Sequence, residues 1–342
     1  DRSPVGLTYR LADVPPDSEL GRWWDVKAGW SISDDDATFL QRIAWETVQA
    51  YQQGQPQAVA PAAASPPPGT ALYAVWGSSA TDIFVVGSNG TILHGDGNTW
   101  SPMASGATHE LSTVWGSSGS DVFAVGERAT ILHYDGKAWT PMQSGIWDEI
   151  FLVNVWGTSS NDVFAVGCGG TILHYDGSAW STLQGGESYC LYGVWGSSAS
   201  DVFAVGDGGR ILHYDGSTWS AMKSGATKVI YGVWGTSARN VFALGEGGLL
   251  LHYDGSAWRA MESGTQYPLV VAWGSSDREV FAVGDAGTIL HYDGNAWTPM
   301  VSGTTNDLQC VWGRSGSDVY AVGRNLTMLH YDGSTWSPMS WH

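Results

Sequence analysis

The sequence predicts an all-β fold, a seven-bladed β-propeller that follows a short N-terminal extension containing one helix. Two series of seven tryptophans support this prediction. The first series lies in V-W-G or A-W-G at separations of 39 or 41 residues and comprises Trp76, Trp115, Trp156, Trp195, Trp234, Trp273 and Trp312. The second closes D-G-x-x-W at the same separations and comprises Trp100, Trp139, Trp180, Trp219, Trp258, Trp297 and Trp336. A repeat of about 40 residues made of short β patterns is typical of a propeller with one four-stranded blade per repeat.

Each repeat contains four short runs, A to D, that are rich in β-branched and aromatic residues. In the fourth unit these runs are Leu191–Trp195, Val202–Gly206, Ile211–Tyr214 and the segment from Trp219 to Met222. Gly, Ser and Asp separate the runs, and Asp-Gly is a favoured hairpin turn, so the pattern predicts an antiparallel meander. Because the runs are apolar nearly throughout, we expect neighbouring blades to cover both faces of each sheet.

The chain before the repeats has a different composition. We expect an extension over residues 1–52 with an amphipathic helix at about 36–52, a Pro/Ala-rich linker over 53–70, and the propeller over 71–342. Acidic residues precede the helix, where they favour its positive end, and Leu40, Ile43 and Trp45 belong to one apolar stripe. An apolar stripe outside the propeller favours a role in an assembly.

Charge and composition narrow the possible partners and the location. The chain has 33 acidic and 15 basic residues and a formal net charge of −18, which argues against nucleic acid and anionic membranes as partners. No apolar run approaches the ~20 residues needed to span a bilayer. The sequence starts at Asp1 without a signal-peptide pattern, so we expect a mature chain whose leader has been removed or a fragment of a longer one. The expected location is extracellular, cell-surface or periplasmic.

The repeat also resembles that of a known group of propellers. The string T-I-L-H-Y-D-G-x-x-W, preceded by D-V-F-A-V-G, looks like the repeats of bacterial secreted seven-bladed propellers of the sialidase-type (neuraminidase or Asp-box-like) group. The resemblance covers about residues 70–342. The D-G-x-x-W turn is similar to the Asp box of that group, although it is one residue shorter than S-x-D-x-G-x-x-W. The resemblance implies a secreted propeller and says little about activity, because one fold hosts many functions.

Three cysteines leave one without a partner. Cys168 lies in the predicted B–C turn of blade 3, and Cys190 ends the D–A connection into blade 4. The two share a rim on adjacent blades, so they could form a disulfide in an oxidising compartment. The alternative is two buried thiols that pack as small apolar residues. Cys310, inside a predicted A strand, is expected to be a packed thiol.

Seven histidines recur at one position of strand C and raise the question of a metal: His94, His133, His174, His213, His252, His291 and His330. One histidine per blade cannot converge on a single ion, because the blades are arranged radially, so no metal or other cofactor is predicted. We expect each imidazole to bond to the Ser or Asp of the first turn of its blade, similar to the network of WD-repeat propellers. The Asp of D-G is expected to cap its own turn.

Catalytic motifs are missing from the sequence. It contains no H-E-x-x-H, no G-x-S-x-G and no nucleotide-binding glycine loop. A true sialidase would need an arginine cluster for the substrate carboxylate and a Tyr–Glu nucleophile pair. The predicted A strands carry no arginine, and Arg128, Arg210 and Arg324 lie in B–C turns of different blades. No catalytic residue is therefore predicted, and enzymatic activity is the less favoured hypothesis.

The D–A connections vary while the other turns stay nearly constant, so we expect function to be located there. The connection over 146–151 is two residues longer than the others. The candidate binding residues in these connections are Trp147, Asp148, Glu149, Phe151, Tyr189, Tyr267 and His109. Exposed aromatic residues beside carboxylates suit a protein hot spot or sugar stacking. The alternative is that Trp147 and Phe151 fold inward over the mouth of the channel.

These observations predict a non-catalytic binding propeller. We expect it to be an interaction subunit of a larger secreted or cell-surface assembly, with a protein partner or a second copy of itself. The alternative is a glycan-binding or glycan-cleaving propeller that uses the rim formed by the D–A and B–C connections.

Overall fold

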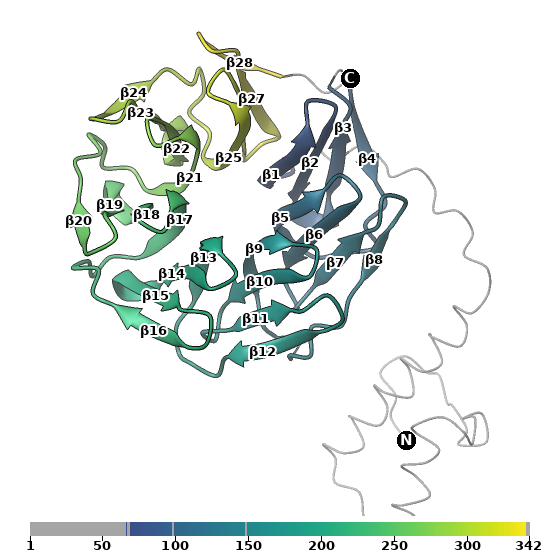
Figure 1. Cartoon of the computed structure of the whole chain (residues 1–342). Helices are drawn as coiled ribbons and strands as arrows, with labels where there is room; N and C mark the ends of the chain where they lie inside the picture. The colour runs from purple at the N-terminus through teal and green to yellow at the C-terminus, as the bar shows by residue number, and fades with distance from the viewer. Residues whose placement is uncertain (1–65, 67–68, 98, 148, 340–342) are drawn as a thin grey trace, which may run out of the picture. The chain divides into compact units, whose positions relative to one another are not determined.

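Seven four-stranded antiparallel sheets stand around a common axis in the computed structural model, which describes residues 66, 69–97, 99–147 and 149–339 (Figure 1). The A strands are β1 (Leu72–Ser79), β5 (Leu111–Ser118), β9 (Leu152–Ser159), β13 (Leu191–Ser198), β17 (Ile230–Ser237), β21 (Leu269–Ser276) and β25 (Leu308–Ser315). The B strands are β2 (Asp82–Gly87), β6 (Asp121–Gly126), β10 (Asp162–Gly167), β14 (Asp201–Gly206), β18 (Asn240–Gly245), β22 (Glu279–Gly284) and β26 (Asp318–Gly323). The A strands lie nearest the axis, as Figure 1 shows.

The outer half of each blade completes the meander. The C strands are β3 (Ile92–Gly95), β7 (Ile131–Tyr134), β11 (Ile172–Tyr175), β15 (Arg210–Tyr214), β19 (Leu250–Tyr253), β23 (Ile289–Tyr292) and β27 (Thr327–Tyr331). The D strands are β4 (Trp100–Met103), β8 (Trp139–Pro141), β12 (Trp180–Gln184), β16 (Trp219–Met222), β20 (Trp258–Ala260), β24 (Trp297–Met300) and β28 (Trp336–Pro338). Four B–C turns contain a 3₁₀ turn: η2 (Ser88–Gly90), η3 (Asp207–Gly209), η4 (Glu246–Gly248) and η5 (Asp285–Gly287). These three-residue turns are the helices of the described part of the chain, and none could span a membrane.

The predicted all-β seven-bladed propeller is confirmed, with one sequence unit per blade. The first sheet is ordered β1-β2-β3-β4 and the last β25-β26-β27-β28, so no strand is exchanged to close the ring. The predicted extension over 1–52, its helix at about 36–52 and most of the linker over 53–70 lie outside the described residues.

The V-W-G motif joins each blade to the next through a close contact. A Cβ atom placed on Gly116 would lie 2.7 Å from Cη2 of Trp76 in the preceding blade. The same contact joins Gly77 to Trp312, which brings the last blade against the first. Glycine follows tryptophan in the motif because any side chain there would occupy the space of the indole ring of the neighbouring blade.

Burial is greatest in the B strands and least in the D strands at the outer edge of each blade. The B strands are buried except at their first residue. In blades 1 to 6 the Phe of the B strand meets the D-strand Trp of the next blade edge to face, as Phe84 meets Trp139 at 6.0 Å between ring centroids. In the D strands, by contrast, most residues after the Trp are exposed. The expectation that both faces are covered throughout is therefore wrong for strand D, because this strand is the outer edge of its blade.

The turns lie on two rims. In blade 4, Gly216 of the C–D turn packs against Ser200 of the A–B turn, and Gly209 of the B–C turn packs against the carbonyl oxygen of Ala226 in the D–A connection. We call the side formed by the A–B and C–D turns the scaffold rim. The side formed by the B–C turns and the D–A connections is called the variable rim.

Candidate binding site

The repeated histidines belong to the scaffold rim. Nε2 of His213 lies 2.7 Å from Oδ1 of Asp201, and the hydroxyl of Ser197 donates to Oδ2 of the same carboxylate at 2.5 Å. The histidine bond recurs in every blade, to Asp82, Asp121, Asp162, Asp201, Asn240, Glu279 and Asp318. The expected bond between strand C and the first turn is confirmed. In blade 5, where the partner is Asn240, burial lowers the pKa of His252.

We call the bonded series of Ser197, Asp201 and His213, with the equivalent residues of the other blades, the histidine relay. The order of its three groups indicates a structural role. The carboxylate of Asp201 lies between the hydroxyl and the imidazole, so His213 is not bonded to the Ser197 hydroxyl as a general base. Among the described residues, no group of three or more His, Cys, Asp or Glu side chains is arranged to hold a metal ion. The relay fixes the A–B turn against strand C.

The aspartates of the D-G turns cap their own turns as expected. Oδ1 of Asp215 accepts hydrogen bonds from the backbone N–H groups of Ser217, at 2.9 Å, and Thr218, at 2.8 Å. The Thr218 N–H, followed by the Ser217 hydroxyl, lowers the pKa of Asp215 to about 2. Much of the negative charge of the scaffold rim therefore belongs to its turns.

The lengthened connection presents Trp147 to solvent. Its side chain is 80% exposed, whereas Ile146 and Ile150 pack against the core between blades 2 and 3. Such exposure is incompatible with an indole that plugs the channel. Phe151 is half-buried, with its carbonyl oxygen bonded to the N–H of Cys168, and Glu149 is exposed. Asp148 lies outside the described residues.

The other predicted residues lie in separate D–A connections of the variable rim. Tyr267 is 55% exposed. Tyr189 is half-buried, with the Arg210 guanidinium 3.7 Å from its ring centroid and its hydroxyl accepting a bond from Gln184. His109 pairs with Glu127 at 3.9 Å. Within the described chain, no hydrogen bond, ion pair or ring contact links the candidate residues of one connection to those of another.

A second group of residues, not selected from the sequence, lies where the A strands begin on the variable rim. We call it the axial cluster. It comprises Tyr73, Tyr192 and Tyr231 at the second position of their A strands, the carboxylates of Glu110, Glu127, Asp207, Glu246, Asp285 and Asp307, and Arg324. The carboxylates and Arg324 either precede an A strand or begin a B–C turn.

Specific contacts connect members of the axial cluster. The Tyr192 hydroxyl donates to Oδ1 of Asp207 at 3.1 Å, and its ring lies 5.7 Å from that of Tyr231. Nε of Arg324 lies 3.2 Å from Oδ2 of Asp307. Six carboxylates and one guanidinium thus lie where the A strands and the B–C turns begin, which makes the axial cluster acidic.

The electrostatics of the tyrosines reflect these neighbours. Burial, and then Glu110, raises the pKa of Tyr73 to about 12. Burial and the hydrogen bond with Asp207 raise the pKa of Tyr192 to about 12. Burial, followed by Glu246 and Asp285, raises the pKa of Tyr231. The three hydroxyls therefore stay protonated at neutral pH and can donate hydrogen bonds.

The signal for the axial cluster was present at a fixed position of the repeat. The residue after D-V-F-A-V-G or its equivalent is Ser88, Glu127, Cys168, Asp207, Glu246, Asp285 or Arg324. Five of these seven are charged, although the residues around them barely change. Variation at one position inside a constant motif would have identified four of the six carboxylates and Arg324, but not the three tyrosines.

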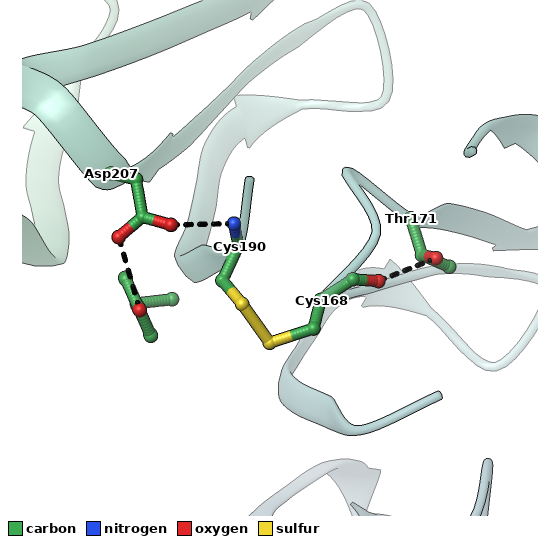
Figure 2. The surroundings of a disulfide bond; sticks show 5 residues. Cys168, Thr171, Cys190 and Asp207 are labelled. Carbon is green, nitrogen blue, oxygen red and sulfur yellow. Dashed lines mark hydrogen bonds between the residues drawn. A yellow bond between two sulfur atoms is a disulfide. The ribbon is translucent and has the colours of Figure 1, made fainter. Parts of the chain in front are cut away.

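A disulfide between Cys168 and Cys190 borders the axial cluster (Figure 2). It joins the B–C turn of blade 3 to the first residue before β13, with 3.9 Å between the Cα atoms. The N–H of Cys190 donates to Oδ2 of Asp207 at 2.8 Å, and the Asp207 carboxylate also accepts from Tyr192. The arginines expected to be dispersed have separate partners: Arg210 stacks on Tyr189, and Arg324 pairs with Asp307.

Comparison with known proteins finds solved structures of similar fold. No protein-family model and no curated protein sequence matches the chain. YCF48 from Cyanidioschyzon merolae has a TM-score of 0.64 and 19% sequence identity, and the match covers 78% of this chain and 97% of that one. YCF48 bound to D1 peptide has a TM-score of 0.65 and 17% identity, with 79% of this chain and 98% of that one covered. The WD40 propeller domain of Doa1 has a TM-score of 0.67 and 12% identity, with 79% of this chain and 94% of that one covered. None of the three is described as sialidase-type. At these identities the likeness shows a shared β-propeller fold.

Proposed function

We propose that this chain is a non-catalytic binding propeller that holds a segment of a protein partner on its variable rim. The observation that carries the proposal is the 80% exposure of Trp147 in the one lengthened connection. Ile146 and Ile150 of the same loop are half-buried against the core, so the loop has an inward-facing apolar anchor and an outward-facing indole. Tryptophan is among the residue types that contribute most binding energy at interfaces, and an exposed one is a candidate contact.

The axial cluster adds a preference for a basic segment. Six carboxylates with one guanidinium attract a positively charged partner and repel an acidic one. The protonated hydroxyl of Tyr231 can donate to a backbone carbonyl, and the rings of Tyr192 and Tyr231 can receive a Lys or Arg side chain.

Two further observations support the proposal. A protein of similar fold has been solved with a bound peptide, YCF48 with D1 peptide, so a propeller of this kind can receive a protein segment. The Cys168–Cys190 disulfide suits an oxidising compartment, which supports the extracellular, cell-surface or periplasmic location and the secreted assembly implied by the sialidase-type resemblance.

A glycan is the second candidate partner. Trp147 and Tyr267 are exposed on the same rim, and exposed aromatic rings are the groups on which sugar rings stack. The two candidates differ in their dependence on charge, because a neutral glycan would gain nothing from the axial carboxylates.

Panning a phage library of random dodecapeptides against the propeller tests the proposal. We expect the enriched peptides to be rich in Lys and Arg, and Trp147→Ala to weaken their binding about 30-fold without lowering the melting temperature. Val301→Ala is the matched control, because Val301 is 87% exposed on another D–A connection of this rim. If both variants bind the enriched peptides as tightly as the wild type, Trp147 has no role in binding. Binding on a glycan array without peptide enrichment would favour the second candidate.

A further inference from the structure

We propose that the Cys168–Cys190 disulfide is a redox-sensitive clamp that holds the connection between blades 3 and 4 and, through it, the Asp207–Tyr192 pair of the axial cluster. Reduction would loosen this connection while the rest of the ring keeps its structure. The effect on partner binding rests on the proposed function, whereas the clamp itself does not.

The first observation is a serine that anchors the other D–A connections. In blade 4, the hydroxyl of Ser224 donates to the carbonyl oxygen of Gly209 at 2.6 Å and accepts the N–H of Ala226 at 3.1 Å. A serine at the same position accepts the N–H two residues later in the other connections of this type: Ser105, Ser144, Ser263 and Ser302. Each serine ties its D–A connection into a fixed turn.

The connection between blades 3 and 4 lacks this anchor. The equivalent residue is Gly185, in the sequence Gln184-Gly185-Gly186 where the others read x-Ser-Gly. The disulfide occurs in this same connection, between residues 22 apart in the chain. This connection thus lacks the side-chain hydrogen bond near its start and has instead a covalent bond, which can be broken, at its end.

The second observation links the disulfide to the axial cluster. Cys190 donates its N–H to Asp207 (Figure 2), and Asp207 accepts the hydroxyl of Tyr192, so two consecutive hydrogen bonds lead from the disulfide-bonded Cys190 to Tyr192 of the axial cluster. Backbone bonds also hold this connection, from Glu187 N–H to Gly169 and from Gly170 N–H to Tyr189. Those bonds remain after reduction, so we expect local loosening and not unfolding.

The bond is accessible to a reductant. Both cysteines are only half-buried on the variable rim. A dithiol attacks one sulfur through its thiolate, the Cys168–Cys190 bond breaks, and two protons end on the two cysteine thiols while the dithiol becomes a cyclic disulfide. The third cysteine, Cys310, does not compete in the exchange, because it lies in blade 7 and burial raises the pKa of its thiol to about 11.

Hydrogen exchange measured by mass spectrometry tests the clamp directly. After treatment with dithiothreitol, we expect the amides of residues 185–192 to exchange at least about tenfold faster, and those of the Ser224-anchored connection, 223–229, to stay unchanged. Equal exchange of 185–192 in oxidised and reduced protein would overturn the clamp, whatever the protein binds.

A serine at position 185, as at the equivalent position of the other connections, provides the matched variant. A Cβ on Gly185 would meet no atom closer than 3.8 Å, so Gly185→Ser fits the fold. We expect Gly185→Ser to suppress most of the effect of dithiothreitol on exchange, and Ser224→Gly to loosen 223–229 in both redox states. If residues 185–192 of reduced Gly185→Ser exchange as fast as those of the reduced wild type, the disulfide does not compensate for the missing serine.

The link to binding has its own measurement. The affinity for a Lys/Arg-rich peptide from the panning experiment is expected to fall several-fold on reduction of the wild type and to change little in Gly185→Ser. An unchanged affinity beside accelerated exchange would overturn the coupling to Asp207 and Tyr192. Absence of any peptide binding by the oxidised protein would contradict the proposed function, and the exchange rates of 185–192 would still decide whether the clamp exists.

Discussion

The indole of Trp312, in the last blade, lies against Gly77 of the first, so the ring closes through the same contact that joins every other pair of blades. A Cβ on Gly77 would lie 2.7 Å from Cη2 of Trp312 and 2.9 Å from the carbonyl oxygen of Asp82. We expect Gly77→Ala to destabilise the propeller by about 1–3 kcal/mol, because neither the indole nor the backbone can move freely.

Urea denaturation and the melting temperature check this prediction. Gly185→Ala is the control, since a Cβ there meets only ordinary contacts. Equal stability of the two variants would show that closure does not depend on the glycine.

The histidine relay provides a second prediction with a control inside the same protein. Asp201→Ala leaves His213 and Ser197 without their shared acceptor, and we expect a loss of about 1–3 kcal/mol of stability. Asp201→Asn should cost less than about 1 kcal/mol, because blade 5 uses Asn240 at this position with bonds to His252 and Thr236. The two melting temperatures should differ in that order; an alanine variant as stable as wild type would mean that the relay contributes nothing.

Repetition explains why the scaffold could be predicted. The strand order, the capping by Asp215 and the bond between His213 and Asp201 each recur in every blade or nearly so, and a pattern seen seven times can be separated from chance. The disulfide remained one of two alternatives, because sequence places Cys168 and Cys190 on adjacent blades without fixing whether they meet.

The axial cluster could not be found in the same way, because its chemistry lies where the repeat is broken. Glu246 and Arg324 occupy one position of the repeat and carry opposite charges. Which of these side chains meet depends on the order of blades around the axis, and only the three-dimensional ring shows that Tyr192 contacts Tyr231. On the variable rim, the long D–A connections present the exposed Trp147 and Tyr267, whereas the short B–C turns provide five of the seven charged groups of the axial cluster.

Acid should weaken the scaffold rim below about pH 4. The pKa of Asp215 is lowered from 3.8 to about 2 by the turn it caps, and the pKa values of Asp176 and Asp332 are also about 2. A carboxylate with a lowered folded-state pKa stabilises the fold above its unfolded value, and this contribution is lost as the pH falls toward 2.

Asp215→Asn isolates the effect, because asparagine keeps an oxygen acceptor for the turn and does not titrate. We expect the difference in melting temperature between wild type and Asp215→Asn to be constant above about pH 4 and to shrink as the pH falls toward 2. A difference that does not vary with pH would show that the aspartate acts only through hydrogen bonding.

The last prediction concerns the charge of the axial cluster and rests on the proposed function. Glu246 begins the B–C turn of blade 5 and, after burial, is the next cause of the raised pKa of Tyr231, so its carboxylate acts on this tyrosine of the axial cluster. We expect Glu246→Gln to slow the association of a Lys/Arg-rich peptide about two- to fivefold at low salt, with the difference disappearing at high salt.

Asp277→Asn makes the same change of charge on the scaffold rim, where Asp277 is exposed, and should leave the rate nearly unchanged. Stopped-flow fluorescence at two salt concentrations measures both rates. Equal slowing by the two variants would mean that the net charge of −18 attracts the peptide as a whole and that the axial cluster has no special part in recognition.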